Sequence, residues 1–300
     1  AGSYVLSTTS SSPDPKYEYA DCGIYIATLT VTDDNGCTHD TTISVTVNCP
    51  PTPNFNSSIV CEGDSTVFTD LSIVNTLVAS GHSIIDWNWS FGSSMANDSM
   101  QFDTCGVDVL NITLTVTDNQ TPNCTSSITK PITIACNPTA DFSSNIVCAG
   151  DYTTFINTST PGTYLGIIPN WTHSGGNYVG TNSTSPNPLY EYDICGPSYL
   201  TTLIVTDAYG CADTTSEYAE VWCNPIAIIN PVSPVCEGNP SIFTNSSSGS
   251  TPLTIYSWDM GGAGSYVLST TSSSPDPKYE YANCGIYIAT LTVTDDNGCT

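Results

Sequence analysis

Apolar and hydroxyl-bearing residues alternate in several stretches of the chain. Between positions 23 and 32 apolar side chains alternate with threonine over the second half of the stretch, which is the period of a half-buried β-strand. Asn35-Gly36 follows, and both residues tolerate positive φ, so the pair favours a hairpin. Nowhere do apolar residues keep a helical spacing with caps. The pattern therefore predicts an all-β protein. Equivalent alternating stretches end at Asp33, Asp118, Asp207 and Asp295.

Two nested repeats organise the chain. Residues 1–38 recur 262 positions later as residues 263–300, and 37 of the 38 match because only Asp21 changes, to Asn283. Within that period, prolines at positions 51, 138 and 225 lie 87 residues apart. We expect the C-terminal part of a module at 1–49, modules at 50–136 and 137–223, and a module at 224–300 that lacks its last strand. Since both ends fall inside a module, we expect an excerpt of a longer array.

Each module repeats the same series of signals. A Cys-x-Gly segment precedes a short Phe-bearing strand, a tryptophan ahead of glycine follows, and Cys-Gly introduces the alternating strand. About seven short strands in a module, with a tryptophan near the middle, predict an immunoglobulin-like β-sandwich. We expect Trp89, Trp171 and Trp258 in the core between the sheets, and a sugar-stacking platform is the alternative role.

The motifs resemble those of tandem PKD (polycystic kidney disease) domains. Positions 89–92 resemble the family's Trp-Asp-Phe-Gly-like segment. Positions 187–192 resemble its Asn-Pro-x-x-x-Tyr motif, and positions 285–295 resemble its Gly-x-Tyr-x-x-x-Leu-x-Val-x-Asp strand. The resemblance covers essentially the whole chain. It departs from the family at positions 171–174, which read Trp-Thr-His-Ser, and at Leu110, where the other copies have tyrosine. The resemblance implies a corner-type tyrosine near the core at Tyr25, Tyr199 and Tyr287.

The added cysteines resemble the PKD arrays of very large secreted surface proteins of Bacteroidota, including gliding adhesins. Fourteen cysteines fit an oxidising, extracellular or cell-surface setting. Zinc is the competing interpretation, but tetrahedral sites use ligands two to four residues apart, whereas the closest cysteines here are 12 apart. The resemblance thus implies tandem immunoglobulin-like (PKD-type) β-sandwich domains forming an extended rod.

An immunoglobulin-like topology implies a disulfide framework. The starts of strands B and F lie at one end of such a domain, and the cysteines before a module and after its F–G turn lie at the other. Bonds of the second kind cross a junction between modules, and linkers this short then predict a stiff rod. Cys22 and Cys37 are left over. The expected pairs are Cys61–Cys105, Cys148–Cys195 and Cys236–Cys284 at the first end, and Cys49–Cys124, Cys136–Cys211 and Cys223–Cys299 at the second.

The charge balance excludes some partners. There are 28 acidic residues and three lysines, a formal charge of −25, yet only 10% of the residues are charged and 39% are hydrophobic. Such a chain can bury a core, and it is not a disordered polyelectrolyte. Without arginine it has little to offer phosphates, so nucleic acid is excluded as a partner. No apolar run reaches membrane-spanning length, so we expect no membrane span.

Catalytic motifs are missing from the sequence. The only histidines are His39, His82 and His173, none in His-Glu-x-x-His, and there is no Gly-x-Ser-x-Gly elbow, so we expect no enzyme. A histidine in a Ser-rich loop is interpreted as a solvated residue. We expect no cofactor and no metal. For the aspartates at the F–G turns, turn formation is the main interpretation and calcium the alternative.

Three functions follow as hypotheses. The first is a structural extracellular protein, a disulfide-stiffened fibre, filament or adhesin stalk that self-associates into fibres or bundles. The second is an accessory array that binds carbohydrate or protein for a secreted enzyme, which predicts exposed aromatics such as Tyr164, Tyr178 or Tyr256 for a glycan or surface ligand. The third, an enzyme in its own right, lacks any supporting motif.

Overall fold

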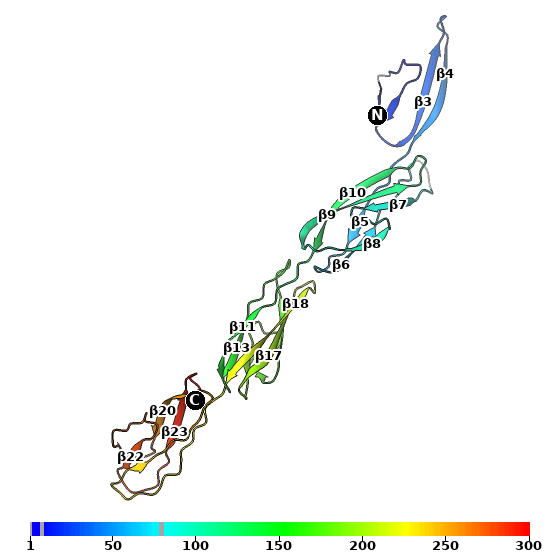
Figure 1. The fold of residues 1–300 in the computed structure, drawn as a ribbon. Coiled ribbons are helices and arrows are strands. Elements are labelled where there is room, and N and C mark those ends of the chain that lie inside the picture. The colour runs from blue at the N-terminus through cyan, green and yellow to red at the C-terminus, as the bar shows by residue number, and fades with distance from the viewer. Residues whose placement is uncertain (1, 7–8, 78–80) are drawn as a thin grey trace. The chain divides into compact units, whose positions relative to one another are not determined.

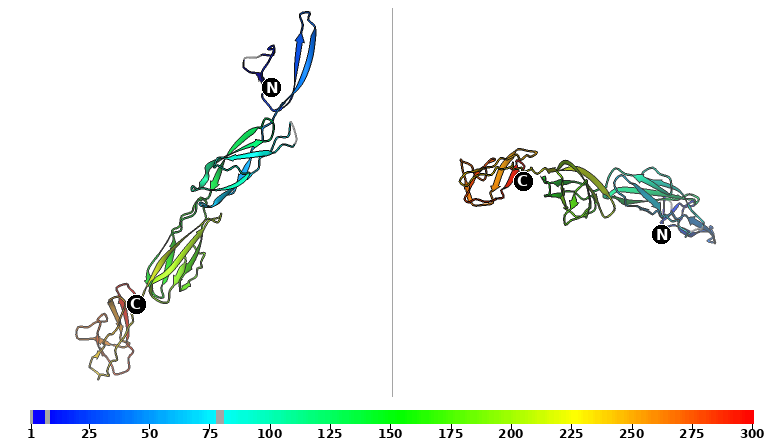
Figure 2. Two further views of the ribbon diagram at one scale, coloured as in Figure 1. Left: turned by 45° about the vertical axis from the view of Figure 1, so that its right-hand side comes forward. Right: turned by 90° about the horizontal axis from the view of Figure 1, so that it is seen from below.

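The chain folds into β-strands throughout the part that the structure describes. The computed structural model describes residues 2–6, 9–77 and 81–300, which fall into two compact units, Ala1–Asn137 and Pro138–Thr300. Figures 1 and 2 show strands joined by turns and loops in both units. Among the described residues, none belongs to a helix that is long and apolar enough to cross a membrane.

The first unit contains one sandwich and two separate strand pairs. The sandwich consists of the antiparallel sheets β5-β6-β8 and β10-β9-β7, and β1–β2 and β3–β4 are the pairs. The strands are β1 (Gly2–Tyr4), β2 (Tyr17–Tyr19), β3 (Gly23–Thr32), β4 (Thr38–Val47), β5 (Phe55–Ser57), β6 (Ser65–Asp70), β7 (Ile84–Trp89), β8 (Asn97–Gln101), β9 (Gly106–Asp118) and β10 (Thr125–Ile134).

The core of this sandwich follows from the alternation along β9. Every second side chain there, Ile112, Leu114 and Val116, is buried. From the opposite sheet Phe55 meets Trp89 of β7 edge-on, with ring centroids 5.1 Å apart. Each large apolar side chain removed from water in this way contributes roughly 1.5–3 kcal/mol.

The second unit contains two sandwiches. The first has the sheets β11-β13-β16-β15 and β12-β18-β17-β14, and the second has β19-β22-β21 and β20-β23. The strands are β11 (Phe142–Ser144), β12 (Val147–Cys148), β13 (Tyr152–Asn157), β14 (Ile168–His173), β15 (Asn177–Tyr178), β16 (Leu189–Glu191), β17 (Gly196–Thr206), β18 (Ala212–Trp222), β19 (Ser241–Ile242), β20 (Leu253–Asp259), β21 (Gly264–Tyr266), β22 (Lys278–Tyr281) and β23 (Thr290–Asp295).

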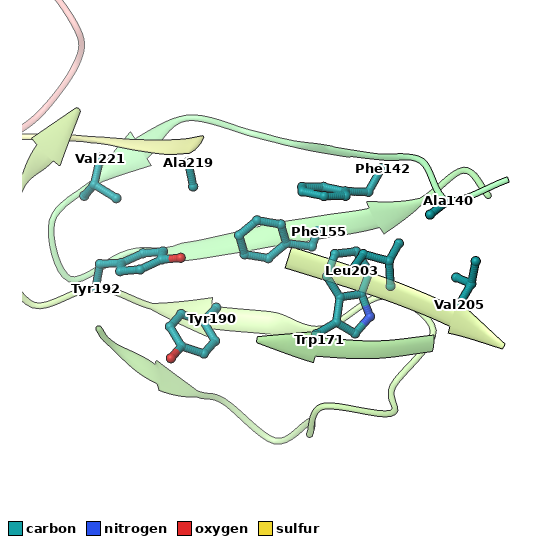
Figure 3. Close-up of a cluster of buried hydrophobic side chains, with 10 residues drawn as sticks. All are labelled: Ala140, Phe142, Phe155, Trp171, Tyr190, Tyr192, Leu203, Val205, Ala219 and Val221. Atoms are coloured by element: carbon teal, nitrogen blue, oxygen red, sulfur yellow. The ribbon is translucent and has the colours of Figure 1, made fainter. Parts of the chain in front are cut away.

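The first of these sandwiches encloses an aromatic core. Figure 3 shows Phe142 and Phe155 from one sheet facing Trp171 and Leu203 from the other. The Phe142 and Trp171 rings meet edge-on at 5.1 Å, which repeats the Phe55–Trp89 geometry of the first unit. The same core is therefore built twice from the same sequence pattern.

The second sandwich, within residues 224–300, has a smaller second sheet. Its core contains Phe243, Trp258, Leu291 and Val293. Among the described residues, β23 pairs only with β20, whereas the equivalent strand β17 lies between β14 and β18. One edge of β23 is thus left without a neighbouring strand.

The three predicted core tryptophans are buried. Trp89 and Trp171 are each 1% exposed and Trp258 is 5% exposed. Each indole N–H donates to a backbone carbonyl, at 2.8 Å to Met95, 3.0 Å to Ser185 and 3.0 Å to Ser274. Because their faces are covered, these rings offer no platform on which a sugar could stack.

The three tyrosines expected near the core are half-buried, and Tyr199 packs against the core of its sandwich. Their hydroxyls donate to backbone carbonyls four or five residues upstream: Tyr25 to Asp21 at 2.8 Å, Tyr199 to Ile194 at 2.5 Å, and Tyr287 to Asn283 at 2.9 Å. These are corner-type hydrogen bonds at the start of the strand. The tyrosines lie at the end of the sheet because the hydroxyl must reach the preceding loop.

Candidate functional site

Four equivalent turns present a cysteine next to an aspartate. In the turn after β3, Asp33 Oδ1 accepts hydrogen bonds from the backbone N–H groups of Asn35 and Cys37, both at 2.9 Å. In the turn after β23, Asp295 Oδ1 accepts in the same way from Asn297 at 3.0 Å and Cys299 at 2.9 Å. In the third turn, Asp118 Oδ1 accepts from the backbone N–H groups of Gln120 and Cys124. In the fourth, Asp207 Oδ1 accepts from those of Tyr209 and Cys211.

These aspartates therefore shape the turns and fix the position of each cysteine. Burial disfavours the charged form of Asp118, but hydrogen bonds from Cys124 and Gln120 outweigh it and lower the pKa of this carboxyl. Calcium was the alternative role for these residues. In the described part of the chain, no three or more His, Cys, Asp or Glu side chains are grouped so that they could hold a metal.

One class of disulfide closes three of the strand hairpins, β3–β4, β9–β10 and β17–β18. It joins the cysteine before the long alternating strand to the cysteine after the next strand, across 27, 31 and 28 residues. The strands are antiparallel, with Gly23 opposite Val47 in β3–β4, so the two cysteines arrive at the same end. Their Cα atoms are 4.7–4.9 Å apart, within the usual range. The bonds are Cys22–Cys49, Cys105–Cys136 and Cys195–Cys223.

A second class of bond crosses from one sandwich to the next. Cys148 on β12 is bonded to Cys299 in the turn after β23, 151 residues later, with Cα atoms 5.6 Å apart. Cys299 is buried. Beside this bond, the Nδ2 group of Asn224 donates to the carbonyl of Ala149 at 2.9 Å. The two sandwiches of the second unit are thus joined by two covalent connections, the polypeptide backbone and this disulfide.

The expected disulfide pairs are wrong. In five of these pairs at least one cysteine is bonded to another partner, and in the sixth both cysteines are free thiols. The first five are Cys61–Cys105, Cys148–Cys195, Cys49–Cys124, Cys136–Cys211 and Cys223–Cys299, and the sixth is Cys236–Cys284. Cys22 is bonded rather than left over. Cys61 and Cys211 are disulfide-bonded as well.

Sheet order explains the largest part of the error. The prediction placed Cys148, at the start of strand B, beside Cys195, at the start of strand F. In the sheet β12-β18-β17-β14, however, β18 lies between β12, which carries Cys148, and β17, which begins directly after Cys195. Cys49 does lie near the turn that carries Cys124, as predicted, because its carbonyl accepts a hydrogen bond from Gln120 Nε2 in that turn at 2.7 Å. Its sulfur, however, is bonded to Cys22.

Four cysteines in the described part of the chain are free thiols. Cys37, Cys236 and Cys284 are exposed, and Cys124 is half-buried. Burial and the nearby Asp118 carboxylate raise the pKa of the Cys124 thiol, so it is the less ready nucleophile. The three exposed thiols are therefore the most accessible of the free cysteines.

His173 does not match the expected solvated loop residue. It lies on β14 with its ring 4.1 Å from that of Tyr190, and its Nδ1 is 3.0 Å from Thr201 Oγ1. Burial lowers its pKa from 6.5 to about 4. A signal was present in the sequence, because His173 is two residues after Trp171 and so points to the same face of the strand.

The tyrosines expected on a binding face are not freely exposed. Tyr178 and Tyr256 pack against the cores of their sandwiches. Tyr164 stacks on Tyr209, with ring centroids 4.0 Å apart. Half-buried rings in separate places do not form an aromatic platform.

Comparisons with known proteins found one family match and several similar solved structures. The PKD domain family matches residues 222–300, and no curated protein matches this sequence. Among solved structures, the N-terminal eight Ig domains of Down Syndrome Cell Adhesion Molecule (DSCAM) isoform 1.30.30 are similar at 11% identity and a TM-score of 0.38, covering 92% of this chain and 40% of that one. Extracellular domains 3–5 of Drosophila OTK are similar at 12% identity and a TM-score of 0.27, covering 84% and 95%.

The strands and sheets make the chain an all-β tandem array of immunoglobulin-like sandwiches, and its residues 222–300 are similar to the PKD domain family. Its several disulfides indicate an extracellular protein, because such bonds persist in oxidising compartments.

Proposed function

We propose that the protein is structural, an extracellular repeat protein whose sandwiches form a stiff rod in a fibre, filament or adhesin stalk on a microbial cell surface. The observation that carries this proposal is the Cys148–Cys299 bond, which crosses from one sandwich to the next. A single covalent connection leaves a hinge between two domains, whereas a second one restricts their rotation. An array with such junctions resists bending.

The charge supports the same role. A net charge of −25 with only three lysines gives solubility and mutual repulsion, and it leaves few salt bridges between copies. Contacts between neighbouring rods would then rely on hydroxyl groups, apolar loops or bridging divalent cations such as calcium. This is the form of self-association that we propose.

Catalysis is not part of the proposal. His173 is enclosed by aromatic rings, and His82 Nδ1 lies 3.3 Å from Asn119 Oδ1 rather than beside a nucleophile. The alternative of an accessory carbohydrate- or protein-binding array has less support, because Tyr178 and Tyr256 pack inward.

Electron microscopy of the isolated chain tests the rod. We expect the oxidised protein to give straight particles with a narrow distribution of bend angles, and the Cys148→Ser variant to give a broader one at the junction. Fibres on the native surface should show an axial repeat of about 110 Å, from three sandwiches with strands of ~3.3 Å per residue plus loops. Bent oxidised particles, or equal distributions for the two proteins, would refute a rod stiffened by this bond.

A further inference from the structure

In each of the three sandwiches, the loop that precedes the tryptophan-bearing strand meets the turn that follows the alternating strand. In the first sandwich, Ser83 N–H donates to Asn119 Oδ1 at 3.0 Å. In the last, the Thr251 hydroxyl donates to Asp295 Oδ2, also at 3.0 Å. The contact between this loop and this turn is therefore a repeated feature of the fold, and its side chains differ from one sandwich to the next.

In the sandwich that contains β14, two phenol rings make this contact. Tyr164 of the loop stacks on Tyr209 of the turn, with ring centroids 4.0 Å apart and an angle of 28° between the ring planes. The turn fixes one of the two residues, because Tyr209 N–H donates to Asp207 Oδ1 at 2.9 Å. Asn35 and Asn297 occupy the same position in the turns after β3 and β23, so the sequence places an aromatic ring there in this sandwich and not in those.

Two tyrosine rings in contact can be joined by oxidation. Removal of one electron and one proton from a phenol gives a phenoxyl radical, whose unpaired electron is shared with the ring carbons next to the hydroxyl-bearing carbon. Two such radicals couple there by a carbon–carbon bond, and the product is dityrosine. The reaction needs rings that touch, access for the oxidant and an acceptor for each proton.

Tyr164 and Tyr209 meet these conditions. Tyr209 is 53% exposed, so an oxidant can reach it and water can take its proton. Burial, the neighbouring phenol of Tyr209 and the Asp207 carboxylate raise the pKa of Tyr164. Asp207 Oδ2 is buried and has no hydrogen-bond partner in the described part of the chain. This carboxylate, which acts on Tyr164 electrostatically, can therefore take up its proton.

Three further tyrosine pairs are stacked in the part of the chain that the structure describes. In each of them the second hydroxyl donates to a backbone carbonyl of the preceding loop. Oxidation would remove this proton and leave the carbonyl without its donor, so the fold opposes it. Tyr192 is moreover only 1% exposed. The pairs are Tyr19–Tyr25, Tyr192–Tyr199 and Tyr281–Tyr287, with ring centroids 4.3, 4.2 and 3.9 Å apart.

We propose that Tyr164 and Tyr209 are a modification site, at which hydrogen peroxide and an extracellular peroxidase join the two rings as dityrosine. The bond ties the loop before β14 to the turn after β17. This inference does not depend on the fibre role, because both residues belong to one sandwich.

The atoms and electrons balance with peroxide as the oxidant. Each phenol gives up one electron and one proton, and one molecule of hydrogen peroxide takes up both electrons and both protons and becomes two molecules of water. The two radicals form the carbon–carbon bond, and the hydrogen on each coupled carbon then moves to the oxygen of its own ring. The chain therefore loses two hydrogen atoms.

Peroxidase treatment of the dilute 300-residue protein tests the proposal. Its free thiols are alkylated first, because peroxide also oxidises cysteine. We expect each chain to stay monomeric, to lose the mass of two hydrogen atoms and to gain the fluorescence of dityrosine, and we expect peptide mapping to join Tyr164 to Tyr209. A cross-link on another tyrosine pair, cross-links only between chains, or no dityrosine would overturn the proposal.

Two variants at stacked pairs separate this site from the others. Tyr209→Phe keeps a ring in the turn but has no hydroxyl to oxidise, and we expect it to lose the fluorescence and the mass change. Since Tyr209 is exposed at a turn, this substitution leaves the core intact. Tyr287→Phe is the matched control, because it removes one hydroxyl from a stacked pair of the last sandwich, and we expect the same yield as for the unchanged protein. Dityrosine that persists in Tyr209→Phe, or disappears in Tyr287→Phe, would place the reaction on a different pair and contradict the assignment.

Discussion

The segments 1–38 and 263–300, here called the N-terminal and C-terminal copies, have one sequence in two structural settings. In the N-terminal copy, β3 pairs with β4, and Tyr25 of β3 stacks on Tyr19 of β2 with ring centroids 4.3 Å apart. In the C-terminal copy, β23 pairs with β20 and faces a core, but among the described residues no strand takes the place of β4. The comparison separates what these residues dictate locally from what their neighbours decide.

Local features are the same in both copies. The hairpins β1–β2 and β21–β22 have the same register, with Gly2 opposite Tyr19 and Gly264 opposite Tyr281. The aspartate turns and the corner-type tyrosine hydrogen bonds are also repeated. These features depend on contacts within a few residues or within one hairpin, so they survive the change of setting.

Burial and covalent bonding differ. Leu29 is 55% exposed, whereas its counterpart Leu291 is 7% exposed. Cys37 is a free, exposed thiol, whereas Cys299 is buried and bonded to Cys148. Cys22 is bonded and Cys284 is free. These properties depend on residues far away in the sequence.

The largest expected difference between the copies concerns the junction disulfide. Replacing Cys299 by Ser removes a bond that closes a loop with a sequence separation of 151 residues, and we expect it to destabilise the last sandwich by roughly 3–5 kcal/mol. Urea unfolding with hydrogen exchange read at β23 measures the effect. Cys37→Ser is the matched control, because the same residue in the N-terminal copy has no bond to lose. Equal losses in both variants would contradict the assignment.

The second prediction concerns the strand face. Leu291→Ala leaves a cavity in the core and should cost about 2–3 kcal/mol, whereas Leu29→Ala should cost less than about 0.5 kcal/mol, because that side chain already contacts water. Denaturant titrations of both variants compare them directly. A large effect of Leu29→Ala would mean that β3 has a partner in solution that covers its face.

The third prediction allows the two sandwiches of the second unit to be told apart. The sandwich with β14 contains His173, whose pKa is lowered to about 4 by burial, whereas residues 224–300 contain no histidine. Since the unfolded chain takes up the proton near pH 6.5 and the folded chain only near pH 4, stability falls as the pH decreases between these values. We expect a loss of roughly 1–2 kcal/mol after allowance for solvent screening.

A His173→Phe variant is the control for this acid effect. It keeps an aromatic ring against Tyr190 but cannot take up a proton. We expect the difference in unfolding free energy between pH 7 and pH 4 to shrink by the histidine contribution. An unchanged difference would show that His173 is solvated in the folded protein.

Much of the fold could be predicted from the sequence because it depends on local patterns. Alternation predicted the strand ending at Asp118, and the position of Trp89 ahead of glycine predicted its burial. Asn35-Gly36 predicted a turn, which forms with Gly36 at a φ of +85°. In each case the controlling contacts lie within a strand, a turn or one recurring core position.

The disulfide partners could not be predicted in the same way. Whether Cys148 meets Cys195 depends on which strand lies between their strands, and that is decided by hydrogen bonding between β12 and β18 rather than by the spacing of the cysteines. The burial of His173 was not predicted, because its Ser-rich surroundings favoured a solvated loop. Its position two residues after Trp171 places both side chains on the same face of the strand. Both errors concern long-range neighbours, and these are also what distinguishes the N-terminal copy from the C-terminal copy.

The smallest predicted effect tests whether the one sequence difference between the N-terminal and C-terminal copies contributes to their different structures. Asp21 and Asn283 are the only residues that differ between the copies. Tyr25 and Tyr287 each donate to the backbone carbonyl at this position, at 2.8 and 2.9 Å, so the corner hydrogen bond does not require either side chain. We expect Asp21→Asn and Asn283→Asp to change stability by less than about 0.5 kcal/mol and to leave the hydrogen-exchange pattern of β3 and β23 as it is. If Asn283→Asp instead protected the backbone amides of residues 285–289 from hydrogen exchange, the side chain at position 283, and not the lack of a neighbouring strand, would determine where β23 begins.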